Sequence, residues 1–255
     1  ALGRLQATGC MTGSPYWPET AAALKPLDGM ADIGLHLTLT DQRPLGPMPD
    51  LAADGRLPSV GGLLKRALTG KLNRAEIAAE LDRQLDSFEG AFGRPPDFID
   101  GHHHVHQLPG IGEAVIAAWK TRLDGTGWVR SCLEPPAAIL SRRVSPLRAL
   151  VISQLGRGFR HRLEQAGVPH NRSFRGVYDF SGKVAFARLF RRFTDRPGPD
   201  CLMMVHPGLV DEPLRAADRL TDQREVEYRF LASDSCVLDL AARGVTLSRL
   251  FPPRP

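Results

Sequence analysis

Short apolar runs alternate with longer amphipathic segments along this chain. Four runs have the length and composition of buried strands: residues 31–40, 98–102, 128–132 and 201–206. Apolar residues recur at helical spacing in three further segments, residues 73–92, 111–123 and 221–232. Strands that alternate with helices of ten or more residues are typical of βαβ units. The pattern therefore predicts an α/β fold with mostly parallel strands.

The clearest helical pattern lies in residues 73–92. Its apolar side chains recur at intervals of three or four residues, at Ile77, Leu81, Leu85, Phe88 and Phe92. Asn73 and Glu76 have the spacing of a capping box, in which two side chains bind backbone N–H groups at the start of a helix. We expect a helix over 73–92 with one face on the core.

The two ends of the chain carry shorter patterns. Residues 1–7 resemble the last turns of a helix, which Gly9 would close in a left-handed conformation. Near the other end, Ser235 has the position of a cap for a last helix that Gly244 ends. Residues 245–247 then predict a final strand.

No repeat, low-complexity tract or flexible linker divides the chain. Its 255 residues suit one large domain, and we expect a single domain over residues 1–255. The least regular part is 134–182, which contains four prolines, Pro135, Pro136, Pro146 and Pro169. We expect this part to form a cap or an insertion.

Composition excludes several classes of protein. Hydrophobic residues make up 42% of the chain and charged residues 24%, which is typical of a globular protein. No apolar run approaches the roughly 18 residues that a membrane span needs. The four cysteines form no C-x-x-C pair, and some lie in apolar runs, which favours a reducing compartment and a cytoplasmic protein.

The net charge of +5 raises the question of an anionic partner. No basic run with interleaved aromatic residues is present, so we predict no nucleic-acid partner. Residues 142–163 mix apolar side chains with six arginines, Arg142, Arg143, Arg148, Arg157, Arg160 and Arg162. Such a segment more often packs on its own domain with the arginines at the rim, but it can also lie on an anionic membrane. Peripheral contact with the inner face of the membrane is therefore the second interpretation.

The chemistry is concentrated in a histidine-rich segment, residues 100–106, which directly follows a predicted strand. Four histidines in five positions form a dense set of metal-capable nitrogens. If the backbone stays extended, alternation places Asp100 on one face together with His102, His104 and His106. His103 would then point to the other side, and its loss would not affect a metal.

Two further histidines lie at or near strand ends. His36 interrupts an otherwise apolar strand, and His206 directly precedes a Pro-Gly turn. In parallel α/β folds the carboxyl ends of the strands form the active-site face. No nucleophilic-serine, nucleotide-binding or H-E-x-x-H motif is present. Histidines without a nucleophile favour a metal-activated water.

The order of these motifs resembles that of the YdjC/ChbG-like carbohydrate deacetylases. The resemblance covers nearly the whole chain and rests on residues 34–39 with 43–45, 99–106, 205–208 and 220–225. Two segments, residues 128–135 and 174–180, are most similar to the hopanoid-biosynthesis-associated HpnK branch.

The resemblance implies a distorted β/α barrel and a metal-dependent hydrolase that removes an N-acetyl group from an amino sugar. It implies that His36 and His102 coordinate one divalent metal ion, magnesium or zinc. His206 would be the catalytic acid for the departing amine, and Asp100 would orient an imidazole. Four further residues are expected to bind substrate or support the site: His104, His106, Arg224 and Glu225.

One departure from the family pattern concerns the amino-terminal end. The family opens with a strand ending in N-A-D-D-F-G, whose acidic pair supplies a metal carboxylate and the general base. This sequence lacks that motif, so the first strand of the barrel is expected to be missing from it. The alternative to a deacetylase is a catalytically degenerate scaffold that binds a metal or a sugar.

Two substrates stay open at this point. One is a chitooligosaccharide, and the other is an N-acetylglucosaminyl-hopanoid, which is lipid-linked. A homodimer is compatible with the sequence.

Overall fold

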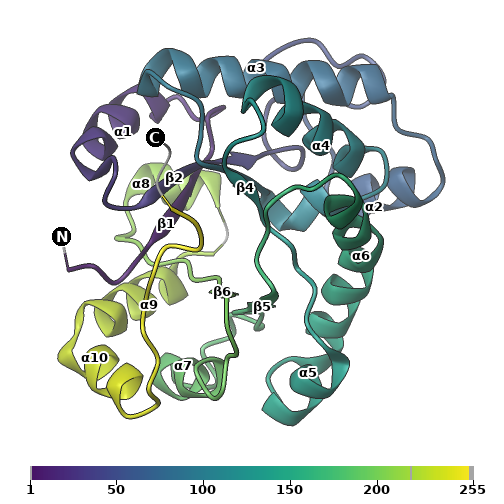
Figure 1. Ribbon diagram of the computed structural model, residues 1–255. Helices are drawn as coiled ribbons and strands as arrows, with labels where there is room; N and C mark the ends of the chain where they lie inside the picture. The colour runs from purple at the N-terminus through teal and green to yellow at the C-terminus, as the bar shows by residue number, and fades with distance from the viewer. Residues whose placement is uncertain (1, 219, 253–255) are drawn as a thin grey trace. The chain divides into compact units, whose positions relative to one another are not determined.

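The computed structural model describes residues 2–218 and 220–252, which form two compact units (Figure 1). The larger unit consists of Leu5–Ser131, Leu155–His170 and residues 249–252. The smaller unit consists of Cys132–Gln154, the described residues of Asn171–Ser248 and residues 2–4. Helix α6 (Pro146–Gln165) contributes its first half to the smaller unit and its second half to the larger one.

The larger unit is built around a parallel sheet. Its elements are, in chain order, β1 (Ala7–Cys10), α1 (Trp17–Leu24), η1 (Lys25–Leu27), β2 (Asp32–Leu37), α2 (Val60–Leu68), α3 (Arg74–Phe92), β3 (Phe98–Gly101), η2 (His102–Gln107), α4 (Ile111–Arg122) and β4 (Trp128–Val129). The strand order is β1-β2-β3-β4, and every pairing is parallel. The predicted α/β fold with parallel strands is confirmed.

Helix α3 covers the sheet with the face that its periodicity predicts. Leu81 and Leu85 are buried in the main core with strand residues such as Leu35, and Phe88 stacks on Trp17 of α1 with ring centroids 5.2 Å apart. Burying a leucine or phenylalanine side chain of this kind contributes about 1.5–3 kcal/mol. Helix α4 lies beside α3 (Figure 1).

The start of α3 shows how a sequence motif is used differently in three dimensions. Asn73 caps the helix as predicted, because its side-chain oxygen accepts from the N–H groups of Ala75 and Glu76 at 3.1 and 3.3 Å. The Glu76 carboxylate does not complete a capping box. It accepts instead from the N–H groups of Asp50 and Leu51, at 2.8 and 3.1 Å, and so fixes a loop against the helix.

Both chain ends differ from the prediction. The segment before Gly9 is not a helix end: residues Ala7–Cys10 form β1, and Gly9 pairs with Gly34 of β2. The last helix begins at Asp234, with Ser233 rather than Ser235 at its N-cap position, and residues 245–247 form no strand. Four-residue patterns are too short to separate a strand from a helix end, because long-range pairing decides between them.

The smaller unit has its own sheet and core. Its remaining elements are α5 (Pro136–Arg142), β5 (Ser173–Arg175), α7 (Phe186–Phe193), β6 (Cys201–Met203), α8 (Glu212–Ala217), α9 (Asp222–Ala232) and α10 (Asp234–Ala241). Strands β5 and β6 pair in parallel. An aromatic cluster that includes Phe186, Phe190 and Phe193 forms one core of this unit.

A buried ion cluster joins the start of the smaller unit to β5. Both Glu134 carboxylate oxygens accept from Arg142, at 2.5 and 2.6 Å, and the Arg175 Nε atom lies 3.2 Å from the same carboxylate. Arg142 is thus buried, and the expectation that it faces a membrane was wrong. Sequence pattern alone does not reveal an ion-pair partner eight residues away.

No helix in the described part of the chain is both long and apolar enough to cross a membrane.

Candidate functional site in the larger unit and around His206

The sheet register places His36 and Asp100 side by side. They are direct partners between β2 and β3, near the carboxyl ends of both strands. The Asp100 Oδ1 atom lies 2.6 Å from His36 Nδ1. A carboxylate that holds one imidazole nitrogen leaves the other nitrogen, Nε2, available to a metal or a substrate.

A glycine in the neighbouring strand makes room for this pair. A Cβ atom at Gly9 would lie 3.1 Å from Asp100 Oδ1 and 3.3 Å from His36 Nδ1, which is tighter than ordinary van der Waals contact. Gly9 therefore has a packing role in β1 rather than a helix-closing role.

Asp100 stays ionised in this setting. Burial by itself would raise its pKa, but the neighbouring His36 and Arg130 and the hydrogen bond from His36 hold the pKa below its ordinary value. The Arg130 Nε atom lies 2.9 Å from Asp100 Oδ2. The Asp100 carboxylate is thus held between the His36 imidazole and the Arg130 guanidinium.

The histidine-rich segment turns instead of continuing the strand. His102–Gln107 forms the 3₁₀ turn η2, in which His103 and His104 have positive φ values of 51° and 61°. Alternation of side chains therefore does not apply after Gly101, and the predicted shared face was wrong. Three successive histidines followed by Val105 and His106 have no periodic preference that would signal such a turn in the sequence.

The turn gathers histidine rings near the sheet edge. The His102 ring meets the His36 ring edge-on, with centroids 5.6 Å apart, and the His103 ring lies 3.8 Å from that of His102. His103 Nδ1 also lies 2.9 Å from the Thr40 hydroxyl oxygen. His103 consequently belongs to the cluster and does not point away from it.

The last two histidines of the segment contact Arg130. His104 is half-buried, and its Nδ1 lies 2.7 Å from Arg130 Nη1. His106 is fully buried, its Nε2 lies 2.9 Å from the Arg130 carbonyl oxygen, and burial lowers its pKa to about 3. Of the two roles expected for His106, this position is compatible with support of the site and not with substrate contact.

Arg130 is the residue that the sequence analysis missed. It is buried, and its guanidinium reaches Asp100, His104 and the Gly101 carbonyl. The sequence offered one indication of its role. Arg130 is a single cation in the apolar run 128–132, and a charge buried in a strand requires partners.

The donor set fits a metal only in part. His36 Nε2 and the adjacent His102 ring are suited to a divalent ion, since imidazoles are common ligands of zinc and related metals. Among residues 2–218 and 220–252, however, no group of three or more His, Cys, Asp or Glu side chains is arranged as a metal site. The two histidines thus fit as part of a ligand set.

His206 lies in the smaller unit, three residues after β6. Its backbone N–H donates to Glu227 Oε2 at 2.5 Å, and the Tyr178 hydroxyl donates to Glu227 Oε1 at 2.5 Å. The Phe180 ring meets the His206 imidazole edge-on, with centroids 5.2 Å apart. Burial raises the pKa of Glu227. Glu227, also missed, therefore fixes the segment that carries His206.

Arg224 and Glu225 hold the loop after His206. Arg224 donates to the Asp218 carboxylate at 2.5 Å, and its carbonyl accepts from the Gly208 N–H at 3.1 Å. Glu225 accepts from the Val210 N–H at 3.4 Å. These contacts are consistent with a supporting role, the second of the two roles expected for them.

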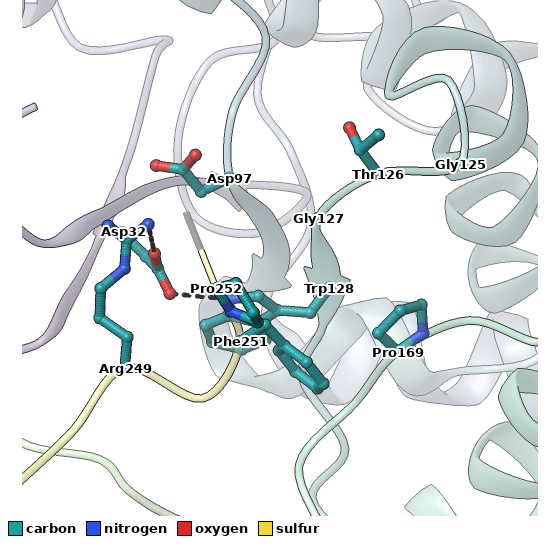
Figure 2. Close-up of a pocket in the computed structure, with 10 residues that line it drawn as sticks. All are labelled: Asp32, Asp97, Gly125, Thr126, Gly127, Trp128, Pro169, Arg249, Phe251 and Pro252. Carbon is teal, nitrogen blue, oxygen red and sulfur yellow. Dashed lines mark hydrogen bonds and ion pairs between the residues drawn. The ribbon is translucent and has the colours of Figure 1, made fainter. Parts of the chain in front are cut away.

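A cavity of about 170 Å³ lies at the amino ends of β2, β3 and β4, the opposite edge of the sheet from the histidine cluster. Figure 2 shows Arg249 reaching Asp32 and Phe251 lying beside Trp128. Ligands of parallel α/β sheets bind at the carboxyl ends, so this cavity is not the candidate site.

Taken together, the larger unit brings His36, Asp100, His102 and His104 into one cluster, while His206, Arg224 and Glu225 form a second cluster in the smaller unit. The class defined by fold and site is an α/β protein with a histidine-carboxylate site at the carboxyl edge of a parallel sheet. The model of the YdjC-like protein family matches residues 1–242. The chain belongs to the YdjC-like family.

Two relatives and a solved structure agree with this assignment. The chain is 30% identical over 249 residues to a chitooligosaccharide deacetylase of Enterobacter sp. (strain 638), covering 96% of this chain and 86% of the relative. It is 32% identical over 224 residues to a chitooligosaccharide deacetylase of Yersinia pestis (strain Pestoides F), covering 84% and 75%. A crystal structure from Enterococcus faecalis V583, described as a cellobiose-phosphate cleavage protein, superposes with a TM-score of 0.69 at 21% identity, covering 98% and 88%. This last likeness supports the distorted-barrel α/β fold.

Proposed function

We propose that this protein is a carbohydrate deacetylase that hydrolyses the acetamide of an acetylated amino sugar. The observation that carries the proposal is the His36–Asp100 pair beside the His102 ring, at the sheet edge where parallel α/β folds bind ligands. The names of the relatives support the substrate class, a chitooligosaccharide.

The residues suit a metal-assisted hydrolysis. His36 and His102 would hold a divalent ion, zinc or magnesium, which supplies a Lewis acid and a water of lowered pKa. Asp100 keeps the His36 ring in one orientation by accepting from Nδ1. The hydrogen bond from His36 and the ion pair with Arg130 keep Asp100 ionised, so it is a positioning residue rather than a proton donor.

His206 is proposed to protonate the departing amine, because an amide anion is a very poor leaving group. The contacts that order the segment around His206 support this role. Glu227, which also accepts from the Tyr178 hydroxyl, holds the His206 backbone, and Phe180 packs against the ring, so the imidazole is held in a defined position. A positioned imidazole is the usual general acid near neutral pH.

Acetate release from a chitooligosaccharide tests the function. The protein is expressed from its complete coding sequence and assayed before and after treatment with a chelator, and then with zinc or magnesium added back. We expect acetate release that the chelator abolishes and one of the metals restores. Acetate release that is insensitive to the chelator would contradict the metal dependence. Absence of acetate release with either metal would contradict the deacetylase and favour the catalytically degenerate scaffold.

A lipid-linked acetylated sugar is the finer proposal for the substrate. It is supported by three exposed apolar side chains of α5 and α6, Leu140, Leu147 and Val151, which are 55%, 77% and 50% exposed. Arg143 and Arg148 are exposed beside these residues. An apolar surface with a basic rim suits an anionic membrane.

A further inference from the structure

Arg130 fixes where two neighbouring histidine rings, His104 and His106, carry their protons. Its guanidinium has only donors, and its carbonyl has only acceptor capacity. A ring nitrogen that faces the guanidinium must therefore accept a hydrogen bond, and one that faces the carbonyl must donate one.

His104 and His36 receive opposite roles. Arg130 Nη1 donates to His104 Nδ1 at 2.7 Å, so a neutral His104 ring has its proton at Nε2. The Asp100 carboxylate accepts from His36 Nδ1 at 2.6 Å, so a neutral His36 ring has its lone pair at Nε2. The two rings are chemically different although both are histidines of one cluster.

The same guanidinium links the two rings. Arg130 Nε lies 2.9 Å from the carboxylate that holds His36, while Nη1 of the same planar group holds His104. His104 is therefore fixed near the His36–Asp100 pair. His106 also has its proton at Nε2, since that atom faces the Arg130 carbonyl at 2.9 Å, but this ring is fully buried and serves Arg130 itself.

A metal ligand needs a lone pair, whereas a protonated ring nitrogen offers a hydrogen bond. We propose that His104 is a substrate-binding residue, whose Nε2–H donates to an oxygen of the acetylated sugar, and that Arg130 is the positioning residue that sets this tautomer. The proposal rests on the proposed deacetylase function. It gives His104 a different role from His36 and His102, because His104 Nε2 carries a proton and cannot bind a metal.

The test compares His104→Ala, His104→Gln and the control His161→Ala, which replaces an exposed histidine of the same unit. Glutamine can accept from Arg130 through its oxygen and still donate through its amide, so it should replace the imidazole. We expect His104→Ala to lower kcat/KM on a chitooligosaccharide about 10²-fold, the effect of losing one positioned donor. His104→Gln should recover at least tenfold, and bound metal should be unchanged in all three variants.

A second measurement does not depend on activity. The ¹⁵N shifts of the imidazole nitrogens should show a protonated Nε2 and an unprotonated Nδ1 for His104, with the reverse for His36. A protonated Nδ1 on His104, or loss of metal together with activity in His104→Ala, would overturn the proposal. Full activity of His104→Ala in an active protein would also overturn it, whereas an inactive unmodified protein would overturn the proposed function as well.

Discussion

Gly9 shows how one missing side chain supports the site. Gly9→Ala would place a methyl group 3.1 Å from Asp100 Oδ1 and 3.3 Å from His36 Nδ1, and the pair would have to shift. Because small displacements of positioned groups are costly for catalysis, we expect kcat/KM to fall about 10- to 10²-fold. Acetate release measures this. Gly61→Ala in α2 is the matched control, since a Cβ there meets no atom within 4 Å, and equal activity of the two variants would contradict the packing role.

His206 is the residue whose role is tested by changing the leaving group. As an acid, its replacement by alanine should lower turnover of an acetamide about 10²–10⁴-fold. An acetate ester should be affected much less, because its leaving group requires less help from a proton. Metal content should stay unchanged. Equal losses on both substrates, accompanied by loss of metal, would show that His206 is a ligand instead.

At the scale of elements, periodic segments were predictable and irregular ones were not. Residues 73–92 carry a helical repeat and a capping asparagine, and α3 begins and ends within one residue of that prediction. The turn His102–Gln107 has no such repeat, although His103 and His104 have positive φ values and His104 contacts Arg130. Residues 36 and 102 could be proposed from the family motifs, whereas Arg130 and Glu227 emerge only from tertiary contacts.

The exposed apolar side chains of α5 and α6 lead to a prediction about membrane binding. Leu147→Ser combined with Val151→Ser should weaken binding to vesicles that contain anionic lipid, because both side chains are at least half exposed. Binding should also weaken with salt, since each nearby arginine contributes on the order of 1 kcal/mol of screened attraction. Vesicle flotation measures both effects. Leu68→Ser, at an exposed leucine of α2, is the control. Failure of the unmodified protein to bind the vesicles would contradict the membrane contact.

At the scale of the whole molecule, stability should depend on pH through His106. Its pKa of about 3 in the folded state lies below the ordinary value of 6.5, so the unfolded chain binds the proton more readily between these values. The free energy of unfolding should therefore fall as pH decreases from 6.5 towards 3, by at most about 1.4 kcal/mol per pH unit for one proton.

Urea unfolding at pH 7 and pH 4.5 measures this dependence. His106→Gln keeps an amide donor for the Arg130 carbonyl but does not titrate, so its stability should change less between the two pH values. His161→Gln, at an exposed position, should behave like the unmodified protein. The same pH dependence in all three proteins would assign the acid sensitivity to other groups.

His36 and His102 are proposed to form the metal-binding part of a deacetylase site, with Asp100 as support. The most direct test measures bound metal and acetate release together in His36→Ala, His102→Ala and Asp100→Asn, with His161→Ala as control. The account predicts that both alanine variants lose most of the metal and the activity. Asp100→Asn should weaken metal binding about 10- to 100-fold, the usual effect of removing a carboxylate behind a ligating histidine. Unchanged metal content in His36→Ala and His102→Ala would contradict the account.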